Sequence, residues 1–92
     1  MVNKMDEFRN RHDNIQKVIL RFANPMDGKL EIKVYIKDYK YQEANLRVDW
    51  QRLKDAGAIR CKGAFRKAER WMNTNKDFVL KLIDEQFPTF WD

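Results

Sequence analysis

Hydrophobic and polar residues alternate along the stretch KLEIKVYIK at residues 29–37. Every second position is apolar: Leu30, Ile32, Val34 and Ile36. Since successive side chains of a β-strand point to opposite faces of a sheet, this alternation predicts a half-buried strand. A similar run starts at Ile15, and the segment between the two runs contains Pro25 and Gly28, which are typical turn residues. The two runs predict a β-hairpin over residues 15–37.

Helical spacing replaces alternation in most of the remaining chain. Apolar residues recur there at intervals of three and four, which is the spacing of one face of an α-helix. The helices predicted in this way cover residues 4–13, 50–56, 63–73 and 77–87. Residues 38–47 fit a strand, a loop or a helix, so a third strand near residues 44–48 is an open alternative.

Capping residues define the ends of several predicted helices. Asp49 is placed to cap the N-terminus of the second helix, and Gly57 is placed to end it. The segment from Thr74 to Asp77 resembles a capping box, with Asp77 in place of the usual glutamate. Pro88 is expected to stop the last helix because proline cannot continue the backbone hydrogen bonds.

These elements predict a single α+β domain that covers residues 1–92. A two-stranded sheet is not stable alone in water, so the apolar face of the hairpin needs a cover. We expect a β-hairpin or small antiparallel sheet that is covered on one face by three to four short helices.

Candidate chemistry is sparse. The chain contains no serine, one histidine, His12, and one cysteine, Cys61. Nucleophilic catalysis needs a nucleophile beside a base, and a structural zinc site usually takes four cysteine or histidine ligands. Arg60 and Lys62 flank Cys61 and could lower the pKa of its thiol, although an unreactive loop thiol is the plainer interpretation. We therefore expect a protein that is not an enzyme and that uses no cofactor, metal or small-molecule substrate.

The apolar segments of the chain are short. None approaches the roughly 18 residues needed to span a bilayer, and the N-terminal segment lacks the apolar stretch of a signal peptide. A single cysteine also fits a reducing compartment. These features lead us to expect a cytoplasmic protein without membrane partners.

Positive charge is concentrated in one part of the chain. The net charge is +5, and residues 50–76 carry eight basic side chains against two acidic ones. Five cations fall close together: Arg60, Lys62, Arg66, Lys67 and Arg70. Arg66 and Arg70 lie one helical turn apart, which suits contacts with successive phosphates or carboxylates. The cluster predicts binding to nucleic acid or to a complex that contains it; the alternative is a solvated helix face, with Glu69 as the only acidic residue inside the cluster.

The polar face of the hairpin adds further cations and a tyrosine: Lys17, Arg21, Lys33, Tyr35 and Lys37. The last three are secondary candidates for this binding surface. Aromatic and cationic side chains occur together where proteins stack on nucleic-acid bases. Lysine-rich strand faces also protect sheets from aggregation, so ordinary solvated surface is the alternative interpretation.

The other aromatic residues form two groups. Five fall at core positions of predicted helices: Trp50, Phe65, Trp71, Phe78 and Phe87. Tyr39, Tyr41 and Trp91 have no such explanation, and they could stack on bases or anchor a protein interface. The tail residues Phe90 and Trp91 are expected either to dock on the core or to meet a partner.

One local resemblance is to winged-helix DNA-binding domains. Residues 53–60, LKDAGAIR, resemble the end of the recognition helix in that family, where the chain leads into the wing. The resemblance implies a small DNA-binding regulator.

The second resemblance concerns the whole chain. A small α+β protein with a concentrated basic face and no catalytic group resembles phage-encoded antidefence proteins, particularly anti-CRISPR proteins that bind type I crRNA-guided surveillance complexes. This resemblance implies an inhibitor whose basic residues contact the guide RNA or occupy the channel for target DNA, which blocks hybridisation. We take this as the expected function; a winged-helix regulator and a phage structural or assembly protein are the alternatives.

Overall fold

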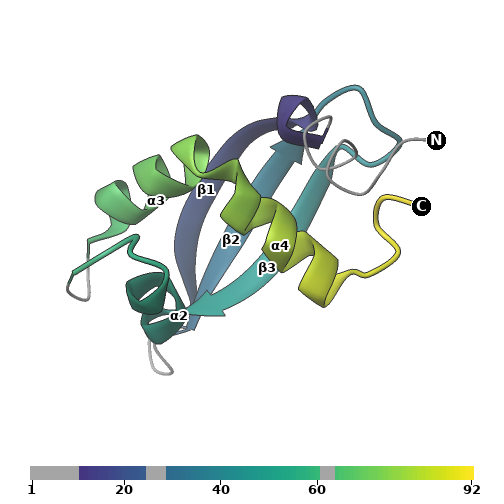
Figure 1. Cartoon of the computed structure of the whole chain (residues 1–92). Coiled ribbons are helices and arrows are strands. Elements are labelled where there is room, and N and C mark those ends of the chain that lie inside the picture. The colour runs from purple at the N-terminus through teal and green to yellow at the C-terminus, as the bar shows by residue number, and fades with distance from the viewer. Residues whose placement is uncertain (1–10, 25–28, 61–63) are drawn as a thin grey trace.

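The computed structural model describes residues 11–24, 29–60 and 64–92. Three antiparallel strands form one sheet in the order β1-β2-β3 (Figure 1). The strands are β1 (Ile15–Asn24), β2 (Lys29–Ile36) and β3 (Glu43–Asp49). The helices α2 (Trp50–Asp55), α3 (Phe65–Thr74) and α4 (Lys76–Gln86) follow in the chain. The expected small α+β fold is confirmed.

The predicted hairpin is the β1–β2 pair. Val18 pairs with Val34 and Leu20 with Ile32 in antiparallel register. The third strand, which the sequence left open, is present and pairs with β2. The four turn residues between β1 and β2 lie outside the described part of the chain.

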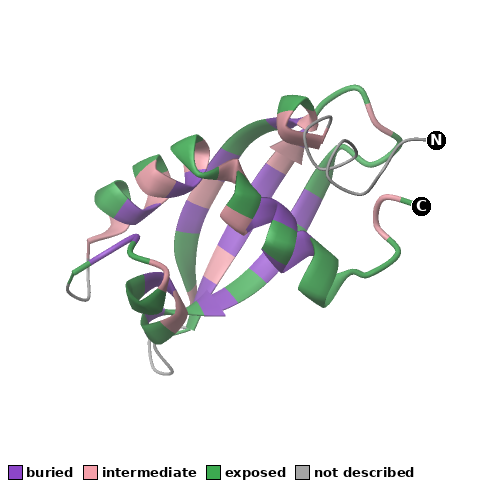
Figure 2. Ribbon diagram, in the orientation of Figure 1, coloured by how far each residue is buried: buried purple, intermediate pink, exposed green. Residues whose placement is uncertain are grey.

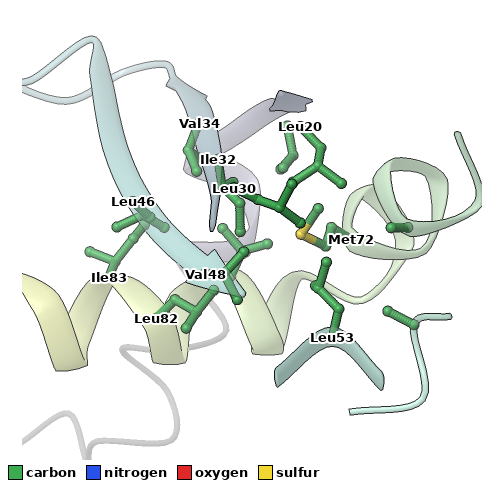
Figure 3. Close-up of a cluster of buried hydrophobic side chains, with 14 of the residues drawn as sticks. Leu20, Leu30, Ile32, Val34, Leu46, Val48, Leu53, Met72, Leu82 and Ile83 are labelled. Carbon is green, nitrogen blue, oxygen red and sulfur yellow. The ribbon is translucent and has the colours of Figure 1, made fainter. Parts of the chain in front are cut away.

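Only one face of the sheet is covered. Helices α3 and α4 lie across the same side of the sheet, and buried positions alternate with more exposed ones along the strands (Figures 1 and 2). Strand side chains such as Ile32 and Leu46 meet Met72 of α3 and Leu82 and Ile83 of α4 in a single hydrophobic core (Figure 3). These five side chains are at most 1% exposed. The opposite face of the sheet is not covered by any described helix.

The two ends of α2 follow the predicted capping signals. The Asp49 carboxylate accepts a hydrogen bond from the Arg52 backbone N–H at 2.8 Å. After the helix, Gly57 adopts φ +86°, a conformation that glycine takes without the steric cost of a Cβ.

The predicted capping box at the start of α4 is wrong. Thr74 is the last residue of α3, and its hydroxyl donates to the carbonyls of Arg70 and Trp71. Asn75 alone separates the two helices and makes no side-chain capping bond. Asp77 instead lies 2.5 Å from the His12 ring nitrogen. Because the turn is this short, Thr74 is still helical and cannot adopt the extended conformation of an N-cap.

The C-terminal tail docks on its own chain. The Tyr39 hydroxyl donates to the Phe90 carbonyl at 2.9 Å, and the Tyr39 and Trp91 ring centroids lie 4.9 Å apart. Phe90 and Trp91 pack against the core as partly buried residues. Phe87 was predicted to be core but is 43% exposed, because it follows the last turn of α4 and leaves the apolar stripe of that helix.

The N-terminal helix is described only in part. Residues 11–14 are helical, and the rest of the predicted helix lies outside the described residues. Across the described part of the chain, every helix is too short or too polar to cross a lipid bilayer.

Candidate nucleic-acid interface

Side-chain bonds to the edge of β1 fix the orientation of α3. Glu69 accepts a hydrogen bond from the Leu20 N–H at 3.0 Å. Asn73 accepts from the Val18 N–H at 2.9 Å and donates to the Val18 carbonyl at 3.0 Å. The Asn73 amide therefore satisfies both backbone groups of an edge residue, as a neighbouring strand would. One side of α3 is anchored along β1.

The anchored side determines which residues of α3 face outward. Ala68 and Met72 are buried in the core, and Glu69 and Asn73 occupy the adjacent rows along β1. An α-helix turns about 100° per residue, so Arg66 follows next in the direction away from the core. Arg70 lies in the same row and points directly away from the core, and Lys67 lies beyond it on the flank of α3 that faces away from β1. All three cations are exposed.

Glu69 does not pair with these cations. It is the only acidic residue between positions 56 and 76, and the sequence alone leaves it free to neutralise the cluster. One of its carboxylate oxygens is committed to the β1 backbone. Among the described residues, Arg66, Lys67 and Arg70 form no ion pair. We call these three residues the α3 basic row.

Other cations between residues 50 and 76 have different environments. The Arg52 guanidinium donates to both carboxylate oxygens of Glu85, at 2.9 and 3.0 Å. This hydrogen bonding lowers the pKa of Glu85 from its ordinary value. Arg60 is exposed in the connection between α2 and α3. Lys62 and its neighbour Cys61 lie outside the described residues, so the structure does not place them.

Strand β1 adds two cations that the sequence did not mark as primary candidates. Lys17 and Arg21 are exposed, and the alternation along β1 puts them on the uncovered face of the sheet. No acidic residue occurs in β1. Since α3 is anchored on this strand, Lys17 and Arg21 lie between the α3 basic row and the centre of the uncovered face. The alternating pattern predicts their place on the polar face of the hairpin, whereas the position of α3 along this strand depends on a tertiary contact.

The three hairpin candidates occupy a different position from the α3 basic row. Lys33 and Tyr35 lie on the uncovered face of the central strand and are partly buried by their neighbours. The Lys33 ammonium is 3.3 Å from the Glu43 carboxylate and 5.3 Å from the centre of the Tyr35 ring. Lys37 is exposed just beyond the end of β2. The fold thus places Arg66, Lys67 and Arg70 on the outer surface of α3 and keeps Lys33 and Tyr35 on the uncovered face of the sheet.

The element order can be compared with the winged-helix resemblance. Residues 53–60 run from α2 into the connection that precedes α3. The next described element is therefore a helix, where a winged-helix domain has a strand hairpin. All three strands of the described chain precede these residues.

The described residues contain no group of three or more histidine, cysteine, aspartate or glutamate side chains that could hold a metal ion. Comparison of the chain with known protein families, curated proteins and solved structures finds no match.

Proposed function

We propose that this protein is a non-enzymatic nucleic-acid-binding protein and that the α3 basic row contacts the phosphate backbone. The observation that carries the proposal is the environment of α3. Three exposed cations form no ion pair with a described residue, while the nearby carboxylate of Glu69 is bonded to β1. Cations without protein partners remain available to phosphates, and their binding releases the counterions that surround nucleic acid.

The geometry of α3 suits contact with one phosphate strand. Residues four apart on a helix have Cβ atoms about 5–6 Å apart, so Arg66 and Arg70 project side by side. A guanidinium group can donate two parallel hydrogen bonds to one phosphate. Lys17 and Arg21 add positive charge on β1, the strand along which α3 is anchored.

The resemblance to antidefence proteins gives a more specific form of the proposal. In that form the nucleic acid is part of a crRNA-guided surveillance complex, and the protein blocks hybridisation with target DNA. Binding to the assembled complex would then be much tighter than binding to free duplex DNA. Sequence-selective duplex binding would instead favour the regulator alternative.

Fluorescence anisotropy with labelled RNA and DNA tests the proposal. The informative variant is Arg66→Glu/Arg70→Glu. A matched control is Lys54→Glu/Lys81→Glu, which makes the same net charge change at exposed residues of α2 and α4. Circular dichroism confirms that both variants are folded.

We expect the α3 variant to bind at least about tenfold more weakly than the control. The slope of log affinity against log salt concentration should fall by about two, because each lost phosphate contact removes roughly 0.9 from that slope. Equal losses in the two variants would show that only net charge matters. An unchanged affinity in the folded α3 variant would contradict the assignment of the interface to α3.

A further inference from the structure

We propose that the uncovered face of the sheet binds a single strand of nucleic acid, with one base stacked on Tyr35. This inference rests on the proposed function and names its substrate class as single-stranded. It also adds a second contact surface that is distinct from the α3 basic row.

A shallow hollow lies beside Tyr35. It has a volume of about 480 Å³ and is lined by Gln16, Lys17, Ile19 and Tyr35. Tyr35 and Lys17 are direct partners in the β1–β2 register. Ile19 pairs with Lys33 and is therefore the diagonal neighbour of Tyr35. The hollow combines an aromatic ring, an apolar floor and a cation, which are the groups that accommodate a stacked base and its phosphate.

Charged neighbours hold the edge of this site in place. Glu43 pairs with Lys33 at 3.3 Å, and Lys33 in turn lies 5.3 Å from the centre of the Tyr35 ring. The ring is thus flanked by a lysine whose position is set by a carboxylate on the next strand. The direct partners of Tyr35 on the two neighbouring strands are Lys17 on β1 and Glu43 on β3, so Lys17 is the cation that lines the hollow.

Basic residues outnumber acidic ones on the uncovered face of the sheet. Lys17 and Arg21 are exposed on β1, the strand to which α3 is anchored; β1 contains no acidic residue, and Glu31 on β2 is the direct partner of Arg21. The outward positions of the three strands carry five basic residues, Lys17, Arg21, Lys29, Lys33 and Arg47, against three acidic ones, Glu31, Glu43 and Asp49. A strand that contacts Arg66 and Arg70 can cross the edge of β1 and reach Tyr35. This charge complementarity favours a polyanion over an apolar or basic protein segment on the same face.

The stacking contact requires an unpaired base. In a duplex, each base is already stacked between its neighbours and its aromatic face is not accessible. Tyrosine can therefore stack only on a base that is splayed out of a single strand, as occurs on the sheet surfaces of RNA-binding domains. The inference predicts tighter binding of single strands than of duplexes.

Photocrosslinking tests the contact in the unmodified protein. A single-stranded oligonucleotide that contains 5-iodouracil is irradiated with the protein, and the crosslinked peptide is identified by mass spectrometry. We expect the crosslink at Tyr35. Crosslinks confined to other residues, such as those of the C-terminal tail, would overturn the inference.

Anisotropy measurements on variants complete the test. Tyr35→Ala should weaken single-strand binding about tenfold, in the range found for loss of one base–aromatic stack, and should leave duplex binding unchanged. Tyr35→Phe should retain the affinity because it keeps the ring. The matched control Tyr41→Ala removes an exposed tyrosine that lies outside the three strands and should have no effect.

The outcomes separate this inference from the proposed function. If Tyr35→Ala binds single strands as well as the unmodified protein does, or loses single-strand and duplex binding equally, the stacking inference is wrong. The proposed function would still stand if Arg66→Glu/Arg70→Glu weakens binding. If the unmodified protein binds neither single strands nor duplexes, the proposed function fails and this inference fails with it.

Discussion

Replacing Asn73 tests how α3 is anchored on β1. The Asn73 side chain makes two hydrogen bonds with Val18 and a third with the Glu69 carbonyl, at 2.8–3.0 Å. In Asn73→Ala the Val18 backbone groups lose their partner at a partly buried sheet edge. Water can reach this edge only in part, so these groups are not fully compensated.

The expected loss of stability follows from these bonds. Each hydrogen bond contributes about 0.5–1.5 kcal/mol net, so the two bonds to Val18 give about 1–3 kcal/mol. Alanine has a higher helix propensity than asparagine, and this difference offsets about 0.6 kcal/mol of the loss. The free energy of unfolding should therefore fall by about 1–2 kcal/mol.

Urea denaturation followed by circular dichroism measures this change. For a urea m-value of about 1–1.5 kcal/mol per molar, the midpoint should fall by about 1 M with the m-value unchanged. Asn45→Ala is the matched control, because Asn45 is exposed and its side chain makes no hydrogen bond to a described residue. A midpoint in Asn73→Ala that equals that of the control would refute the anchoring role.

Three further predictions concern other parts of the fold. Trp91→Ala should lower the free energy of unfolding by about 2 kcal/mol. The loss is smaller than for a fully buried tryptophan because the Trp91 ring is only partly buried, against Tyr39. Urea denaturation measures the change, and no loss would show that the tail is not docked. Glu85→Gln should lower stability by an amount that is constant above about pH 5, because the ordinary glutamate pKa is about 4.3. This difference should disappear as the pH falls through the lowered pKa of Glu85. A pH-independent difference in thermal unfolding would contradict the Arg52 contact. Gly57→Ala should lower the free energy of unfolding by about 1 kcal/mol because the backbone φ of this residue is +86°. No atom lies within 4 Å of the added methyl group, so the loss comes from the backbone conformation alone. An unchanged midpoint of urea denaturation would contradict that conformation.

The sheet was predictable because alternation is a local signal. In β2 every second residue is apolar, and the buried positions of the strand are those residues. Strand β3 alternates as well, but its short apolar residue Ala44 and the preceding polar segment gave a weaker signal. The start of α4 was not predictable from capping residues, because a turn of one residue, Asn75, leaves Thr74 within the preceding helix.

The candidate site was predictable only in part. Helical periodicity places Arg66, Lys67 and Arg70 on the outer surface of an amphipathic helix, and the structure has them exposed there. The bond from Leu20 to Glu69 joins residues 49 positions apart, and no local pattern encodes such a contact. For the same reason the sequence could not show that α3 lies along β1, the strand that carries Lys17 and Arg21.

A nuclear magnetic resonance titration tests the central claim most directly. Backbone amide shifts of the ¹⁵N-labelled protein are followed while a single-stranded oligonucleotide is added at low salt. We predict that the largest changes occur in α3 and β1, around Arg66, Arg70 and Lys17, and that they are reversed as salt concentration rises. Changes confined to α4 and the C-terminal tail, or no changes at all, would contradict the claim that the α3 basic row binds nucleic acid.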